Sequence, residues 1–247
     1  MALNKKRGRT IHHQFLVEGI REIEMALETG LQPDEILFNY HWNDSILDAY
    51  RSKLSETKEY ILDDGVFEKI SYRDSVANAV AIFPLFDTNI ASLKLPPTPL
   101  LLVLESIEKP GNLGAMFRTA DAAGVDGIII TNANTDFYNP NVIRASLGTV
   151  FTVPFAITNN DECLEFLQNQ GATIYSTYLE GSVPHFDANM KEATALVMGS
   201  EAFGITDFWI KNSDQCIKIP MNGKADSMNV STAAAVVVYE AIRQRTV

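Results

Sequence analysis

Apolar and polar positions follow a clear pattern in the second half of the chain. Continuous apolar runs, as expected of parallel strands buried on both faces, alternate with segments that suit helices. The predicted strands are residues 100–105, 127–130, 172–178, 195–199 and 216–220. The predicted helices surround residues 116–123 and cover 139–146, 161–170 and 229–244. This alternation predicts an α/β fold with a mostly parallel sheet.

The first part of the chain is built of shorter units. Its apolar residues recur at a helical spacing from Val17 through Ile20 and Ile23 to Leu27, and Gly30 is a plausible helix end. Short strands are predicted over 35–38, 59–62 and 78–83, and helices over 44–54 and after Asp63. These units predict a small α/β domain.

Prolines interrupt the pattern between the two parts. They are Pro84, Pro96, Pro97 and Pro99, in a stretch without sustained periodicity. Weakly patterned, proline-rich sequence is typical of a domain linker. We therefore predict one domain over residues 1–97 and a second over residues 98–247.

Composition narrows the class of protein. Hydrophobic residues make up 46% of the 247 residues, enough for a buried core. The net charge of −11 argues against a simple nucleic-acid binder, so any such contact must use local basic patches. One patch is the N-terminal run of Lys5, Lys6, Arg7 and Arg9, either a solvated tail or an arm that grips phosphate. Without a membrane-length apolar run or a secretory signal, the expected location is the cytoplasm.

The chain offers few ligands to a metal ion. Its two cysteines, Cys163 and Cys216, lie in no C-x-x-C motif or Cys/His cluster, and His185 is the only histidine of the second part. We therefore expect no zinc site, no disulfide framework and no catalytic metal.

Three segments rich in glycine and polar residues follow predicted strands, where open α/β sheets bind their ligands. Their notable residues are Gly111, Asn112, Gly114 and Arg118 in the first, Gly199, Ser200, Glu201 and Gly204 in the second, and Ser227, Asn229 and Ser231 in the third. Each also has a purely structural interpretation: a capped helix with a solvated arginine, a surface loop, and an ordinary N-cap. The first segment lacks the spacing of a dinucleotide fingerprint, which argues against a Rossmann-type oxidoreductase.

Together the three segments resemble the signature motifs of the SpoU/TrmH family of RNA methyltransferases, in the knotted SPOUT superfamily. The first resembles N-x-G-x-x-x-R through Asn112, Gly114 and Arg118, and the second resembles G-x-E-x-x-G through Gly199, Glu201 and Gly204. The third resembles I-P-M-x-G followed by S-L-N-V-S, through Ile219, Pro220, Met221, Gly223, Ser227, Asn229, Val230 and Ser231. Met228 replaces the usual leucine and Ala202 a common glycine. Residues 10–85 are similar to the family's small substrate-binding domain.

The resemblance implies a methyl donor, S-adenosylmethionine, and an acceptor, a ribose 2′-hydroxyl of ribosomal or transfer RNA. It also implies a C-terminal trefoil knot and a homodimer formed through the C-terminal domain, with no membrane or metal partner. A catalytically inactive RNA-binding protein of the same fold is the alternative, against which the intact Arg118, Glu201 and Asn229 argue.

The resemblance also assigns residues to roles. Arg118 would act on the acceptor hydroxyl, either as a base or by gripping a phosphate and stabilising the alkoxide, with Glu201 tuning it. Asn112, Ser227 and Asn229 would position the ribose and Arg118. The cofactor-binding residues would be Gly199, Ser200, Ile219, Pro220, Met221, Met228 and Asn229.

Overall fold

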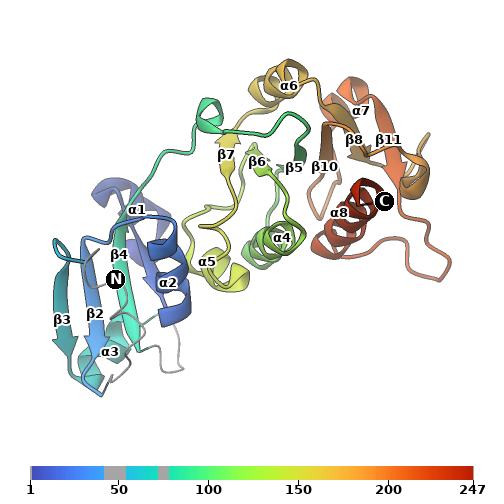
Figure 1. The fold of residues 1–247 in the computed structure, drawn as a ribbon. Helices are drawn as coiled ribbons and strands as arrows, with labels where there is room; N and C mark the ends of the chain where they lie inside the picture. The colour runs from blue at the N-terminus through green and yellow to red at the C-terminus, as the bar shows by residue number, and fades with distance from the viewer. Residues whose placement is uncertain (1, 42–53, 72–77, 247) are drawn as a thin grey trace. The chain divides into compact units, whose positions relative to one another are not determined.

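The computed structural model describes residues 2–41, 54–71 and 78–246, which form two compact units (Figure 1). Unit 1 comprises Met1–Phe86 and Asp136–Thr152, and unit 2 comprises Asp87–Thr135 and Val153–Val247.

Unit 1 contains a four-stranded sheet in the order β1-β4-β2-β3. Strand β4 pairs antiparallel with β1 and β2, whereas β2 and β3 are parallel. The strands are β1 (Gln14–Glu18), β2 (Glu35–Asn39), β3 (Lys58–Leu62) and β4 (Ala79–Pro84). The helices among the described residues are α1 (Lys6–His12), α2 (Ile20–Glu28), α3 (Asp64–Ile70) and α5 (Pro140–Ser146), with a 3-10 turn at Ala2–Asn4.

Strands β2, β3 and β4 agree with the three predicted, but β1 was not predicted, and Val17 does not lie in a helix. It belongs to β1, where Phe15, Leu16 and Val17 are fully buried, and the helix begins only at Ile20. Gly19 separates the two elements with a φ of 109°, a conformation that glycine adopts without strain. The predicted helix over 44–54 lies almost wholly outside the described residues.

The basic N-terminal run is folded rather than a tail, since most of it lies in α1. Arg9 is only 4% exposed and donates two hydrogen bonds to Asp136 Oδ2, at 3.0 and 2.5 Å, and one to the Leu3 carbonyl at 2.6 Å. Arg9 is therefore committed to holding unit 1 together and is not available to a phosphate. Lys5, Lys6 and Arg7 remain exposed.

The segment Asp136–Thr152 packs with the N-terminal residues although it lies within the second half of the sequence. The Tyr138 ring lies 4.9 Å from that of Phe15, and its hydroxyl donates to the Phe86 carbonyl at 3.0 Å. Gly148 approaches Met25 so closely that an added Cβ would lie 2.9 Å from the Met25 Cβ. Helix α5 and its flanks are therefore part of unit 1.

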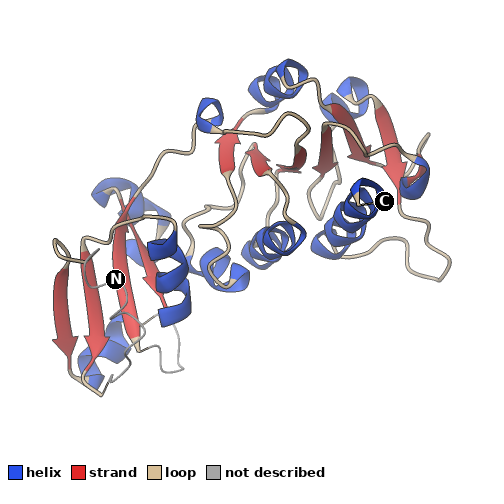
Figure 2. Cartoon of the chain, in the orientation of Figure 1, coloured by secondary structure: helices blue, strands red, loops and turns tan. Residues whose placement is uncertain are grey.

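Unit 2 contains a seven-stranded sheet in the order β7-β6-β5-β10-β8-β11-β9, with all pairs parallel (Figure 2). This confirms the predicted α/β fold with a mostly parallel sheet. The strands are β5 (Leu100–Glu105), β6 (Gly127–Thr131), β7 (Phe155–Thr158), β8 (Thr173–Thr177), β9 (Val183–Pro184), β10 (Thr194–Met198) and β11 (Gln215–Lys218). The helices are α4 (Pro110–Ala123), α6 (Asn160–Asn169), α7 (Asp207–Asn212) and α8 (Val230–Arg245), with 3-10 turns at Ile90–Ser92 and His185–Asp187.

Helices cover both faces of this sheet. Helices α6 and α7 pack on one face, where Cys163, Leu167 and Trp209 join the buried strand residues Val103 and Val197 in one apolar cluster. Helices α4 and α8 lie side by side on the other face (Figure 1). Covering both faces explains why strands β5, β6 and β10 are completely buried and almost continuously apolar. None of the described helices is long and apolar enough to cross a membrane.

We predict that Arg9→Met destabilises the protein by about 3 kcal/mol, because it leaves the Asp136 carboxylate without its buried cation. The measurement is the free energy of unfolding in urea. Arg7→Met, at an exposed position of the same helix, is the matched control and should change that energy by less than about 0.5 kcal/mol. Equal effects of the two substitutions would show that the Arg9–Asp136 pair does not stabilise unit 1.

Candidate active site

Three loops of unit 2 leave the same edge of the sheet. The first loop connects β5 to α4. The second follows β10 and comprises residues 199–205, and the third follows β11 and comprises residues 219–229. Because the strands are parallel, their carboxyl ends meet at one edge, where ligands of open α/β sheets bind. Each loop carries one of the three motifs.

One hydrogen-bond network joins the three motifs. Asn112 Nδ2 donates to Glu201 Oε1 at 2.6 Å, and Asn112 Oδ1 accepts from Asn229 Nδ2 at 3.0 Å. Asn229 Oδ1 in turn accepts from the backbone N–H and the hydroxyl of Ser231, at 2.9 and 2.6 Å, which caps α8. Asn112 is thus in direct contact with one residue 89 positions away in sequence and with another 117 positions away. The structure brings together Asn112, Glu201 and Asn229, three of the five residues predicted to be catalytic.

Glu201 is held as an anion. Its carboxylate accepts hydrogen bonds from the backbone N–H groups of Glu108 and Lys109, at 3.1 and 3.3 Å, besides that of Asn112. Partial burial raises the pKa of Glu201, but these hydrogen bonds outweigh it and leave the pKa below its ordinary value. Glu201 therefore carries its negative charge at neutral pH, at the N-terminus of α4.

The glycines of the second motif shape the 199–205 loop. A Cβ added to Gly199 would lie 2.0 Å from the carbonyl carbon of Gly204, so only glycine fits there. Ser200 and Gly204 exchange two backbone hydrogen bonds, at 2.9 and 3.0 Å, and Gly204 has a φ of 68°. The Ser200 hydroxyl accepts from the Phe203 N–H at 3.1 Å, so Ser200 helps to fix the turn. This narrow turn carries Glu201 towards Asn112.

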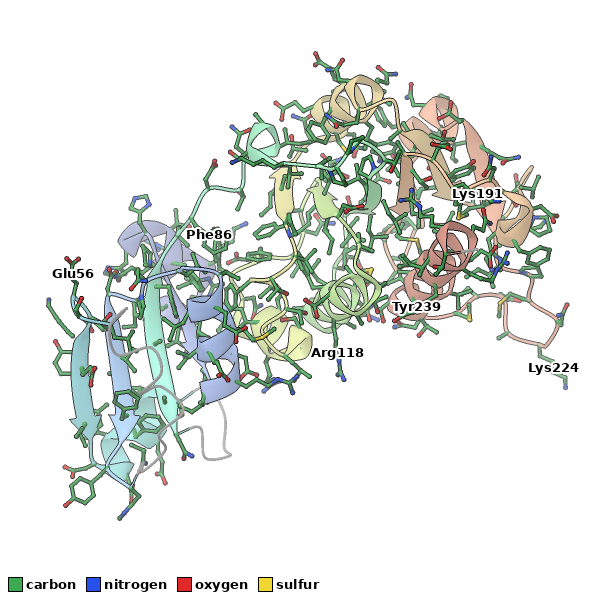
Figure 3. All side chains as sticks on the ribbon, in the orientation of Figure 1. Glu56, Phe86, Arg118, Lys191, Lys224 and Tyr239 are labelled. Atoms are coloured by element: carbon green, nitrogen blue, oxygen red, sulfur yellow. The ribbon has the colours of Figure 1, made fainter. Side chains whose placement is uncertain are left out.

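Arg118 lies apart from this network. It is exposed on α4, projects outward from the helix (Figure 3), and makes no hydrogen bond or ion pair with another described residue. It follows Asn112 by six residues, so the two side chains leave the helix about 120° apart around its axis. Arg118 is available to an external anion but is not placed beside Asn112, Glu201 or Asn229.

The third motif supplies partly exposed apolar side chains. Ile219, Met221 and Met228 are half-buried, while Pro220 and Ser227 are exposed. Strands β10 and β11 are separated only by β8, so the loops that follow them start about 10 Å apart. Apolar side chains suit an adenine ring, and the anionic Glu201 suits a cationic sulfonium. These residues therefore fit S-adenosylmethionine.

Sequence reasoning missed one polar residue near this edge. Glu105, the last residue of β5, is completely buried and accepts a hydrogen bond from the backbone N–H of Thr206. The only signal in the sequence is a carboxylate that ends an otherwise apolar strand. Within the described residues, no group of three or more His, Cys, Asp or Glu side chains could hold a metal ion.

Comparison with known proteins identifies the class. The sequence model of the SpoU rRNA Methylase family matches residues 99–239, and that of the MRM3-like substrate binding domain matches residues 1–81. The chain belongs to the SpoU rRNA methylase family, which confirms the resemblance seen in the three motifs.

Individual relatives agree with this. The chain is 29% identical to the 23S rRNA (guanosine(2553)-2′-O)-methyltransferase RlmP of Bacillus subtilis, over 96% of this chain and 92% of that protein. It is 33% identical to the 23S rRNA (guanosine-2′-O-)-methyltransferase RlmB of Shewanella oneidensis, over 80% of each. Among solved structures it resembles the SpoU methyltransferase AviRb from Streptomyces viridochromogenes in complex with AdoMet, with a TM-score of 0.89 and 25% identity over 99% of this chain and 96% of that one.

We predict that Gly199→Ala destabilises unit 2 by more than about 2 kcal/mol, because the new Cβ collides with the Gly204 backbone and forces the loop apart. The free energy of unfolding measures this. Gly111→Ala is the control, since a Cβ at Gly111 meets no atom within 4 Å. A Gly199→Ala protein as stable as Gly111→Ala would contradict the close approach of the two glycines.

Proposed function

We propose that this chain methylates a ribose 2′-hydroxyl of ribosomal RNA, with S-adenosylmethionine as the methyl donor. The chain is a member of the SpoU rRNA methylase family with all three motifs in place, and nothing supports the inactive alternative. The observation that carries the proposal is the Asn112–Glu201–Asn229 network, which joins one residue from each motif. Ribosomal rather than transfer RNA is proposed because the relatives described above are named 23S rRNA methyltransferases. Such a substrate agrees with the cytoplasmic location that the sequence predicts.

The cofactor is proposed to lie against the loops that follow β10 and β11. Gly199 and Ser200 would contribute backbone groups, Ile219, Pro220, Met221 and Met228 apolar surface, and Asn229 its amide. When bound, S-adenosylmethionine supplies a methyl group activated by its sulfonium charge. Glu201 would favour that charge and hold Asn112 in a fixed orientation.

Arg118 is proposed to serve the acceptor side of the reaction. A guanidinium is a poor base, so we favour a grip on an RNA phosphate together with stabilisation of the developing alkoxide. The exposed Ser227, with Asn112 and Asn229, would position the ribose.

The division of labour is proposed to follow the sequence domains. Residues 1–97 would recognise RNA, in agreement with the substrate-binding model over residues 1–81, and residues 98–247 would transfer the methyl group. We also propose that the C-terminal segment forms a trefoil knot. Supporting this, α8 follows β11 yet packs beside α4 and against β10.

A homodimer through unit 2 is proposed to complete the site. Helix α8 buries Ala234, Val237, Val238 and Ala241, but Ala235, Val236 and Ile242 remain half-buried and Tyr239 is 50% exposed (Figure 3). A second copy would cover this surface. Arg118, which leaves α4 on another side than Asn112, would then reach the partner's site.

We predict that Arg118→Ala lowers kcat/KM for RNA by at least about 100-fold, because a charge contact made in the transition state is lost. The affinity for S-adenosylhomocysteine, measured by calorimetry, should change by less than about twofold. Lys211→Ala is the control, since Lys211 is an exposed cation on α7. Near-normal turnover of Arg118→Ala would exclude the proposed role, whereas failure of the wild type to bind S-adenosylhomocysteine would exclude the proposed function itself.

We predict that light scattering gives the mass of a dimer, and that Arg118→Ala and Asn229→Ala complement each other when co-expressed. Each mixed dimer would hold one intact and one doubly damaged site, so random pairing restores about a quarter of wild-type sites. Inactivity of purified mixed dimers would place Arg118 and Asn229 in the site of a single chain.

A further inference from the structure

Glu105 is a buried carboxylate that has neither a catalytic nor a binding role in the proposed function. Its side chain is completely buried at the carboxyl end of β5. Oε1 accepts hydrogen bonds from Asn160 Nδ2 at 2.6 Å and the Thr206 hydroxyl at 2.7 Å, and Oε2 accepts from the Thr206 N–H at 2.8 Å. A buried carboxylate is costly unless such donors satisfy it, so this position needs a specific reason.

Thr206 shows that the contact is more than incidental. It occupies the N-cap position of α7, where a threonine hydroxyl normally accepts from an N–H of its own helix. In the part of the chain that the structure describes, its side chain makes no such cap and donates to Glu105 instead. The Thr206 hydroxyl therefore does not cap its own helix but bonds to Glu105, 101 residues away in sequence.

Thr206 also directly follows the 199–205 loop that carries Glu201. The other end of this loop is Met198, the last residue of β10, which lies opposite Leu104 in the β5 ladder. Both ends of the loop are therefore fixed to adjacent residues of β5, one by backbone pairing and one by the Glu105 side chain. The middle of the loop is attached to residues 108–112, which continue from β5.

We infer that Glu105 is a positioning residue for methyl transfer: through Thr206 it fixes the 199–205 loop, and with it Glu201, against the Asn112 motif. Asn160 keeps the carboxylate in place, since its Nδ2 donates to Glu105 while its Oδ1 accepts from Trp209 Nε1 at 3.2 Å. One carboxylate thus connects β5, α6 and α7 beneath the loop. The part of this inference that concerns the cofactor rests on the proposed function; the part that concerns the loop does not.

The first test measures amide hydrogen exchange in the peptide spanning residues 196–205 of the full-length protein, without cofactor. Glu105→Gln should speed exchange there about tenfold, as expected for loss of one hydrogen bond to a charged group. Thr206→Val, which lacks only the hydroxyl donor, should act in the same direction. Thr206→Ser retains that donor and should stay within about twofold of wild type.

The second test measures S-adenosylhomocysteine affinity by calorimetry. Glu105→Gln and Thr206→Val should weaken binding about tenfold, whereas Thr206→Ser should not. Leu101→Ala controls for general loss of stability, since Leu101 is fully buried in the same strand near its opposite end. It should lower the Tm while leaving loop exchange and affinity within about twofold of wild type.

Different outcomes overturn different claims. If loop exchange and affinity in Glu105→Gln follow the loss of Tm as they do in Leu101→Ala, Glu105 is only an anchor of the core and the inference is wrong. If Glu105→Gln does not fold, the Thr206→Val and Thr206→Ser pair decides, and equal behaviour of these two variants overturns the inference. If the wild type does not bind S-adenosylhomocysteine, the proposed function fails, and the exchange result alone decides the role of Glu105.

Discussion

The attachment of one loop to one strand end is the constraint on which the candidate site depends. The 199–205 loop is held by Leu104 and Glu105 at its two ends and by Glu108, Lys109 and Asn112 in its middle. Gly199 and Gly204 make the turn narrow enough for these contacts. Because Asn112 also accepts from Asn229, the start of α8 is fixed by the same residue that orients Glu201. A site built in this way is preorganised before any ligand arrives.

The central strands of the second unit could be predicted from the sequence, because strands buried on both faces are almost continuously apolar. The short strands β7 and β9 were missed, since they are only partly buried. Helix α7 was missed because its six residues are too few to show a helical period. Val17 was wrongly assigned to a helix because its spacing to Ile20 fits a helix, whereas a strand ends and a helix begins between them. The membership of Asp136–Thr152 in unit 1 could not be predicted, since it depends on contacts such as that of Tyr138 with Phe86.

Only part of the candidate site could be predicted from the sequence. Asn112, Glu201 and Asn229 were found because their motifs resemble those of the SpoU/TrmH family. Their positions after strands and at a helix start would by themselves also fit ordinary loops and caps. Glu105 was missed because a carboxylate at a strand end shows its role only once Thr206 and Asn160 are seen around it. The same holds for Arg9, which seemed one more basic residue until Asp136, 127 positions away, proved to be its partner. Side chains that are satisfied by distant residues leave no local pattern.

Methylation of a ribose of ribosomal RNA by this site can be tested directly. The most direct measurement incubates the protein with ribosomal RNA and S-adenosylmethionine labelled in its methyl group, and then hydrolyses the RNA in alkali. Cleavage needs a free 2′-hydroxyl, so a ribose methyl leaves the label in a dinucleotide that resists alkali. We expect labelled dinucleotides with wild-type protein, formed at least about 100-fold more slowly with Arg118→Ala. Label recovered only in mononucleotides would mean methylation of a base and would contradict the proposed function.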